Sequence, residues 1–410
     1  MVQTRARRVF NASTKTFTTT TPVGRKLFNT IDTLGHVTQT QTNGLDGLSY
    51  LYDIQGRIKT VTQGPRQLAL SYFSTSDGKN GYLQQITDAL ARTTSFDRDA
   101  FGRVLSQVEP GNATTGFGWD QTGNLTAITP PGKPQHKQGY SPVGLLSSYT
   151  PPQVSGVLTP ATNFAYNLDR QDTTTVRPDG LTLQSTYDSA GKLRTKTWPT
   201  GTVAYDYYAT TTCVGCAPGK LKRLSGPGTS VIDLTYDGRL TKSARWSGIF
   251  GGTTSMGVAW TYDSDFRVIQ EAIDAGTVTT TAKFAFDADG LVTCASPTTC
   301  TPPGTDALQL AYSSVTGLIA AGTLGNLAET WTQNAQGELA TYTVKNGATT
   351  LYAAEYDTPT APRDALGRIL TKRETTASGS VRFQYSYDPR GRMEPFRRAT
   401  CMTRTETGRV

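Results

Sequence analysis

Histidine and cysteine are scarce in this chain. Its 410 residues include two histidines and five cysteines. No nucleophile motif lies near His36 or His136, so the sequence gives no sign of a Ser-His-Asp or Cys-His site. We interpret both histidines as loop residues without a catalytic role. No pair of carboxylates stands out for acid–base chemistry either, so we expect no enzyme activity and no cofactor.

Long apolar segments are also missing. No run approaches the ~18 apolar residues that a membrane helix needs, so we expect no membrane span. The N-terminal stretch MVQTRARRVFNASTKTF is basic and lacks an apolar core, so it is not a secretory signal peptide. No segment shows a convincing apolar period of 3.6 residues, which excludes a fold built from long helices.

The net charge of +8 comes from the two ends of the chain. Residues 1–26 carry +6 and residues 390–410 carry +4, which leaves −2 for everything between them. A nucleic-acid-binding protein would need a basic stripe on its folded part. We therefore expect no nucleic-acid partner for the body of the protein.

Turn-forming residues are abundant. The chain has 41 glycines and 21 prolines, and 36% of its residues are hydrophobic. This content is too apolar and aromatic for a disordered chain, and it favours many short strands over long helices.

One short stretch, YDIQGRI at residues 52–58, has the features of a hairpin. Asp53 suits the first position of a type I turn, because its side chain can accept a backbone N–H two residues further on. Gly56 occupies the fourth position, where a positive φ costs glycine little. Tyr52 and Ile58 suit the strands on either side.

This pattern, aromatic–Asp–x–x–Gly–basic–apolar, recurs at a spacing of about 24 residues. Close copies are WDQTGNL from 119, YDSAGKL from 187, FDADGLV from 286 and YDPRGRM from 387. Looser copies include FDRDAFGRV from 96, YDGRL from 236, YDSDFRV from 262 and YDTPTAPRDALGRI from 356. Each period fits two strands, one tight turn and one looser link. The sequence thus predicts an all-β fold of antiparallel β-hairpin repeats.

The predicted turn residues occupy the aromatic, carboxylate, glycine and basic positions of the pattern. We expect the aromatic rings to pack as a ladder beside the turns. The basic residue after glycine should either pair with the carboxylate of a neighbouring turn or remain a solvated charge. The predicted residues are Tyr52, Asp53, Gly56, Arg57, Phe96, Asp97, Gly102, Arg103, Trp119, Asp120, Gly123, Tyr187, Asp188, Gly191, Lys192, Tyr236, Asp237, Gly238, Arg239, Tyr262, Asp263, Phe286, Asp287, Gly290, Gly367, Arg368, Tyr387, Asp388, Gly391 and Arg392.

The repeat resembles the YD repeat of the RHS (rearrangement hotspot) family, which is related to repeats of teneurins and of toxin-complex C proteins. The resemblance covers roughly residues 30–393, and residues 128–152 also resemble stretches of bacterial RHS proteins. It implies a long spiralling sheet that forms part of a hollow shell. In the bacterial toxins such a shell encloses a C-terminal effector, whose release depends on aspartates in a core that has no match here.

The resemblance implies a structural function and several partners. We expect a non-catalytic shell segment of a toxin-delivery protein, whose partners are the rest of the shell and an effector cargo. We expect it to be extracellular, at the cell surface, or exported by a specialised secretion system. The alternatives are a cell-surface module that binds carbohydrate or another cell, and a decayed fragment with no function of its own.

Three regions are expected along the chain. Residues 1–29 form a basic, poorly structured segment, residues 30–393 form the repeat sheet, and residues 394–410 form an arginine-rich tail that is disordered or frame-shifted. Such a chain would be the middle of an RHS protein, cut or frame-shifted near residue 393.

Four of the cysteines lie in two close pairs. Cys213 and Cys216 lie in one turn insertion, and Cys294 and Cys300 lie in another. Two local disulfides, free thiols and a shared zinc site are the alternatives. The second spacing is loose for zinc and the pairs lie three repeats apart, so we expect no metal ion.

Overall fold

Short antiparallel strands make up almost all of the regular structure in the protein. The computed structural model describes residues 6–79, 81–153, 160–209, 218–248, 255–276, 278–394 and 397–398. These residues form 34 strands of one sheet and a three-residue 3₁₀ helix, η1 (Thr75–Asp77). The predicted all-β fold is therefore confirmed.

The chain divides into two compact units. Unit 1 comprises Met1–Ala113 and Phe284–Val410, and unit 2 comprises Thr114–Lys283. The first part of unit 1 contains β1 (Arg7–Asn11), β2 (Thr16–Thr20), β3 (Lys26–Ile31), β4 (Val37–Thr42), β5 (Leu48–Tyr52), β6 (Ile58–Gln63), β7 (Arg66–Tyr72), β8 (Leu83–Thr87), β9 (Thr93–Arg98) and β10 (Val104–Glu109).

The second part of unit 1 holds the late repeats. Its strands are β26 (Val292–Ser296), β27 (Leu308–Tyr312), β28 (Ile319–Leu324), β29 (Leu327–Gln333), β30 (Leu339–Asn346), β31 (Thr349–Glu355), β32 (Thr371–Thr376), β33 (Gly379–Gln384) and β34 (Arg397–Arg398).

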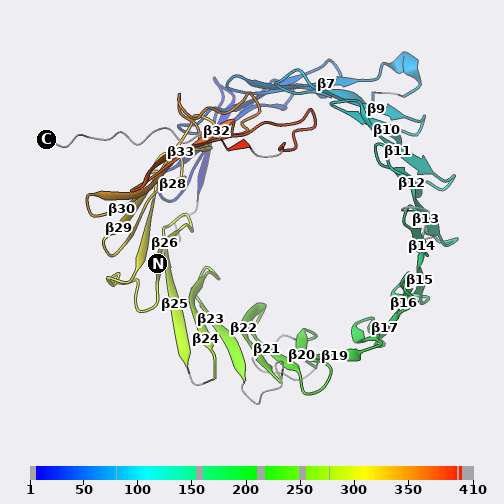
Figure 1. Ribbon diagram of the computed structural model, residues 1–410. Helices are drawn as coiled ribbons and strands as arrows, with labels where there is room; N and C mark the ends of the chain where they lie inside the picture. The colour runs from blue at the N-terminus through cyan, green and yellow to red at the C-terminus, as the bar shows by residue number, and fades with distance from the viewer. Residues whose placement is uncertain are drawn as a thin grey trace. The chain divides into compact units, whose positions relative to one another are not determined.

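Unit 2 continues the same hairpin pattern (Figure 1). The strands β11 (Ala113–Trp119) and β25 (Thr279–Phe286) cross its boundaries. Between them lie β12 (Leu125–Thr129), β13 (His136–Tyr140), β14 (Leu146–Thr150), β15 (Thr162–Tyr166), β16 (Asp172–Val176), β17 (Thr182–Tyr187), β18 (Leu193–Trp198), β19 (Gly201–Tyr207), β20 (Leu221–Ser225), β21 (Val231–Asp237), β22 (Leu240–Ser247), β23 (Met256–Tyr262) and β24 (Val268–Asp274).

Hairpins carry a β-bulge beside the repeat aromatic. In the β5–β6 pair, Leu51 lies opposite Thr60 but Tyr52 lies opposite Ile58, so Lys59 is an extra residue. The same register shift occurs just before the aromatics Tyr72, Tyr187, Tyr262 and Tyr312. A bulge bends its strand and increases the local twist. These repeats therefore bend at the same position.

No large side chain is fully buried in the described part of the chain. The buried apolar residues there are six alanines and Cys294. A single sheet has no second layer to cover its faces, so most strand side chains are half-buried. Strand pairing and turn contacts therefore carry more of the stabilisation than in a two-layer domain.

The strands begin earlier in the chain than expected. We expected residues 1–29 to be poorly structured, but β1 and β2 lie there, and β2 pairs with β3 over five residues. The β2 sequence TFTTT consists of β-branched and aromatic residues, which suit a pleated surface. Of the tail, the structure describes Glu394 and β34, and the rest lies outside the described residues.

Candidate functional site: turn clasps, an aromatic ladder and a seam

A repeated set of hydrogen bonds, which we call the turn clasp, closes the aspartate-containing turns. Asp53 Oδ1 accepts the N–H groups of Gln55 at 3.0 Å and Arg57 at 2.9 Å, and Asp53 Oδ2 accepts Arg57 Nε at 2.7 Å. Gly56, at φ 77°, donates its N–H to the Asp53 carbonyl. The carboxylate thus satisfies backbone donors that a tight turn would leave exposed.

The clasp recurs with the same four-residue spacing. In every case the first residue accepts the N–H of the fifth, and the two side chains bond to each other. The pairs are Asp32–His36, Asp88–Arg92, Asp99–Arg103, Asp120–Asn124, Asn167–Gln171, Asp263–Arg267, Asp364–Arg368 and Asp388–Arg392.

Arg57, one of the basic turn residues, pairs with the carboxylate of its own turn; pairing with a neighbouring turn was one of our two alternatives. Arg57 pairs with Asp53 because the four-residue spacing already brings the two side chains together. It reaches the next repeat by other means, donating to the Gly81 carbonyl at 3.1 Å and lying 4.2 Å over the Tyr72 ring. Lys192 does the same with the Gly219 carbonyl and the Tyr207 ring.

Tyrosines link each repeat to the one before it. The Tyr72 hydroxyl donates to the carbonyl of Ile58 at 2.8 Å, and Ile58 is the residue opposite Tyr52 across the bulge. A buried tyrosine hydroxyl needs such a partner. Equivalent bonds to an earlier strand are made by Tyr52, Tyr140, Tyr166, Tyr187, Tyr207, Tyr262, Tyr312 and Tyr387.

The motif FDRDAFGRV from 96 is aligned differently from our prediction. Phe96 and Asp97 lie within strand β9, and the clasp carboxylate is Asp99. The preceding residue, Arg98, takes the tyrosine's place and donates to the Leu83 carbonyl at 3.0 Å. Counting three residues back from Gly102, and not on from the aromatic, would have found this alignment.

Other clasp and ladder residues escaped the sequence pattern because their chemistry differs. The Asp88–Arg92 turn has no aromatic before it and carries Ala91 in place of glycine at φ 56°. Gln333 and Arg363 replace the tyrosine and donate to the carbonyls of an earlier strand. Only the four-residue spacing from aspartate could have identified the Asp88–Arg92 turn.

Several predicted turn residues lie in shorter turns or in turns without the complete set of clasp hydrogen bonds. Asp237 pairs with Leu240 around Gly238 and Arg239, so this hairpin has a two-residue turn without a clasp. In the Asp188 turn the carboxylate accepts the Lys192 N–H at 2.9 Å, whereas the Lys192 ammonium group donates to the Gly219 carbonyl. The predicted turn glycines have positive φ, namely Gly56, Gly102, Gly123, Gly191, Gly238, Gly290, Gly367 and Gly391.

Within unit 1, links of the early repeats contact turns of the late repeats. We call these contacts the seam. In Figure 1 the orange and red strands of the late repeats lie beside the blue strands of the first repeats. The early contacts come from the links at residues 21–25, 43–46 and 64–66 and from the clasp turn at residues 88–92. They meet the late turns at residues 287–291, 334–338 and 388–392.

Arg25 is the most buried cation of the seam. Its side chain is 9% exposed and lies 3.0 Å from Asp287 and 2.5 Å from Asp289. Asp287 Oδ1 accepts the N–H groups of Asp289 and Leu291, both at 2.9 Å. Leu291 occupies the basic position of this turn, so Arg25 provides the cation from 262 residues away in the sequence.

A second seam contact involves a turn with a neutral residue at the first position and an acidic residue at the fifth. Asn334 replaces the aspartate and Glu338 replaces the basic residue, with Asn334 Nδ2 donating to Glu338 at 2.9 Å. Arg66 from an early link donates two 2.8 Å hydrogen bonds to the two Glu338 oxygens. Bidentate pairs of this kind fix orientation as well as charge. A third arginine, Arg92 of the clasp turn at residues 88–92, donates to the Pro389 carbonyl at 2.9 Å.

The clasp and the seam both stabilise ionised carboxylates. The hydrogen bond from Arg66 lowers the pKa of Glu338 against the opposing effect of burial. Burial alone would raise the pKa of Asp289, but hydrogen bonds from Thr21, Val23 and Arg25 outweigh it, so the pKa is lowered. These carboxylates therefore remain charged at neutral pH.

Neither histidine lies in a catalytic arrangement with a nucleophile in the described residues. His36 Nδ1 lies 3.0 Å from Asp32, and its ring stacks on Tyr52. His136 is the first residue of strand β13 and not the loop residue that we expected; its Nδ1 lies 2.7 Å from the Tyr149 hydroxyl. The described residues contain no group of three or more His, Cys, Asp or Glu arranged to hold a metal ion. No helix among them is long and apolar enough to cross a membrane.

One of the two cysteine pairs is described. Cys294 and Cys300 form a disulfide that closes the loop after β26. A disulfide-bonded pair cannot provide thiolate ligands for zinc. Cys213 and Cys216 lie outside the described residues.

Hairpins closed by clasps and joined in one antiparallel sheet are the features of a β-hairpin repeat protein. The family model described as the Teneurin YD-shell matches residues 10–402. The chain belongs to the Teneurin YD-shell family, which confirms the predicted relationship to YD repeats. No curated protein matches the sequence.

Two solved structures of a Tc toxin complex share the fold. The crystal structure of TcdB2-TccC3 has a TM-score of 0.64 and 13% identity, covering 94% of this chain and 22% of that one. The crystal structure of TcdB2-TccC3-TEV has a TM-score of 0.63 and 11% identity, covering 92% of this chain and 24% of that one. This chain therefore spans less than a quarter of either neighbour.

Proposed function

We propose that the chain is a non-catalytic wall segment of a YD-repeat shell that encloses a polypeptide effector. The observation that carries the proposal is the seam in unit 1, where one row of hairpins is fastened to another by Arg25 and Arg66. When two rows of hairpins are joined side by side, they form a wall that is wider than one row of hairpins. The YD-shell family is a structural one, and the Tc toxin neighbours have the same fold.

The geometry favours a wall over a carbohydrate-binding surface. Sugar recognition by stacking needs aromatic faces and free polar tips. The repeat tyrosines use their hydroxyls for carbonyls of an earlier strand, as Tyr72 and Tyr187 do. The face of the Tyr72 ring is also occupied by the guanidinium group of Arg57.

We propose an extracellular or exported location, with the remaining shell segments and the cargo as partners. The Cys294–Cys300 disulfide supports an oxidising compartment. The related toxin complexes support association with other toxin components.

The test is to isolate the protein from its source cells with a tag inserted at the exposed Lys133 loop. Electron microscopy of the native assembly should find this chain in the wall of a larger shell. An enclosed polypeptide should resist proteinase K until the shell is disrupted. Recovery of the chain alone, with no protected polypeptide, would contradict the proposal. Specific binding to a glycan array would favour the carbohydrate-binding alternative.

A further inference from the structure

Two arginines lie directly opposite each other on neighbouring strands. Arg373 on β32 pairs in register with Arg382 on β33. Like charges in this position destabilise a sheet. Arg223 on β20 shows the usual arrangement, since it lies opposite Asp233 on β21 and donates hydrogen bonds to both carboxylate oxygens at 2.6 and 2.9 Å.

Charge compensation around the arginine pair is incomplete. Arg373 lies 3.4 Å from Glu355, a carboxylate that also accepts hydroxyl hydrogen bonds from Thr358 and Thr360. Arg382 donates one hydrogen bond, to the Thr360 carbonyl at 2.9 Å. Two cations and one carboxylate leave this cluster with a net charge of about +1.

Arg382 also has an unused donor. Its Nε is buried and has no hydrogen-bond partner within the described structure. A buried donor attached to a charged group is costly to leave unpaired. The guanidinium group of Arg382 is therefore short of an acceptor, and Glu355, the carboxylate beside Arg373, already accepts from two hydroxyls.

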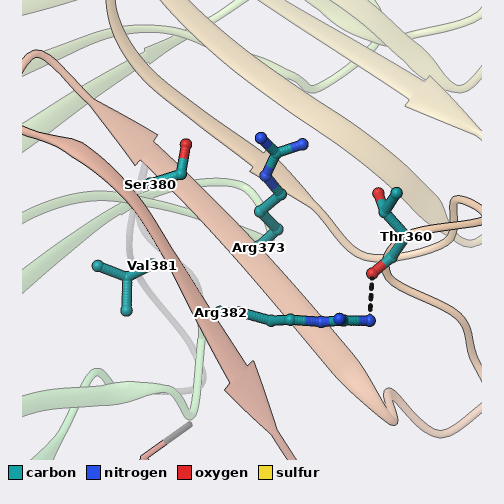
Figure 2. A pocket seen from close by; sticks show the side chains of 5 residues that line it. All are labelled: Thr360, Arg373, Ser380, Val381 and Arg382. Atoms are coloured by element: carbon teal, nitrogen blue, oxygen red, sulfur yellow. Dashed lines mark hydrogen bonds between the residues drawn. The ribbon is translucent and has the colours of Figure 1, made fainter. Parts of the chain in front are cut away.

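A hollow adjoins the pair. It has a volume of about 290 Å³ and is lined by Thr360, Arg373, Ser380, Val381 and Arg382. In Figure 2 the Arg382 side chain extends below that of Arg373 towards Thr360 in this view, and the Ser380 hydroxyl lies on the other side of Arg373. Two of the five lining residues are arginines, and Thr360 and Ser380 add hydroxyl groups to a lining that is otherwise largely apolar.

We propose that this hollow binds an oxyanion, a carboxylate or phosphate group, between Arg373 and Arg382. A guanidinium group presents its N–H donors in a planar fork that matches two oxygens of such an anion. The anion accepts hydrogen bonds from guanidinium N–H groups of the two arginines and reduces the repulsion between the paired cations. The site does not depend on the proposed wall function. Its ligand is either a free anion or an acidic side chain of a polypeptide.

Isothermal titration of the full chain tests the site, with inorganic phosphate and a hexaglutamate peptide as probes and hexaglutamine as the neutral control. Arg382→Gln removes the unpaired donor, and Arg382→Lys keeps the charge without the fork. Arg223→Gln is the matched control, because it removes an arginine from an intact cross-strand ion pair. Circular dichroism checks that each variant folds, and Arg373→Gln replaces any that does not.

At least one acidic probe should bind the wild type and Arg223→Gln equally. Its affinity should fall about tenfold or more in Arg382→Gln and by less in Arg382→Lys. Binding of phosphate identifies a free anion as a sufficient ligand, and binding of hexaglutamate alone identifies a polypeptide carboxylate. Absence of binding by both probes, or equal binding by Arg382→Gln and the wild type, would overturn the proposal.

Discussion

The turn at residues 53–57 and the turn at residues 287–291 have the same backbone hydrogen bonds but obtain their cation from different places. In the first, Arg57 lies four residues after Asp53 and pairs with it. In the second, Leu291 occupies that position, and Arg25 from an early link binds Asp287. A turn that lacks its own basic residue can thus accept one from another row of repeats. The Asp53 turn supplies its own cation and closes one hairpin, whereas the cation of the Asp287 turn also joins two rows.

The largest effect should come from removing the seam cation. Arg25→Met removes the cation that Asp287 and Asp289 share, at 16% and 10% exposure of their side chains. Stranding buried carboxylates should lower the free energy of unfolding by about 3 kcal/mol. Arg57→Met is the matched change in a self-contained clasp, where the 31% exposure of the arginine should make the loss clearly smaller. Urea unfolding measures the loss of stability in both variants. Equal losses would contradict the claim that the seam cation matters more than the cation of a self-contained clasp.

Giving the seam turn its own cation should make Arg25 less important. In a Leu291→Arg background the new guanidinium group takes the place that Arg57 has in its clasp. The loss caused by Arg25→Met should then shrink by about 1 kcal/mol in a double-mutant cycle. Asn124→Arg, in a turn outside the seam, is the control and should leave that loss unchanged. A coupling energy of zero between positions 25 and 291 would contradict the claim that Arg25 provides the cation that this turn lacks at position 291.

Substitutions that change backbone strain at the fourth turn position, in turns away from the seam, should change stability by about as much as the coupling between positions 25 and 291, or by less. Phe266 has φ 63° and is 72% exposed, so Phe266→Gly should stabilise the protein by about 1 kcal/mol. Gly123→Ala should destabilise it by about as much, because φ is 90° and a new Cβ meets nothing within 4 Å. Gly116→Ala, at a strand glycine without positive φ, is the control for thermal melting. A stabilising Gly123→Ala would refute the strain argument.

The smallest effect concerns protonation of the Asp120 clasp, whose fifth residue is asparagine. The side-chain hydrogen bond from Asn124, with bonds from the Asn124 N–H group and from the Thr122 hydroxyl and N–H groups, lowers the pKa of Asp120 to about 2. Because the folded pKa lies below the usual 3.8, this contribution to stability is present above pH 3.8 and is lost as the pH falls towards 2. Asn124→Ala should raise the pKa of Asp120 towards 3.8. Carboxyl ¹³C NMR titration measures it, and an unchanged value would exclude the amide as the main cause.

The sequence predicted the repeat and its turns because their chemistry is local. A carboxylate at the first position, glycine at the fourth and a basic residue at the fifth are sufficient to specify a clasp such as Asp53–Arg57. Polar replacements such as Arg98 and Gln333 were missed because they make the tyrosine's hydrogen bond without an aromatic ring. The seam was not predictable from spacing, since Arg25 and Asp287 are brought together only by the fold.

Hydrogen exchange at the seam turn tests most directly whether a distant arginine holds a late turn in place. The amides of Asp289 and Leu291 donate to Asp287, and those of Gln55 and Arg57 donate to Asp53. We predict that Arg25→Met accelerates exchange at residues 289 and 291 and leaves residues 55 and 57 unchanged. Addition of Leu291→Arg should restore the slow exchange at residue 289. Unchanged rates at residues 289 and 291 in Arg25→Met would contradict the account.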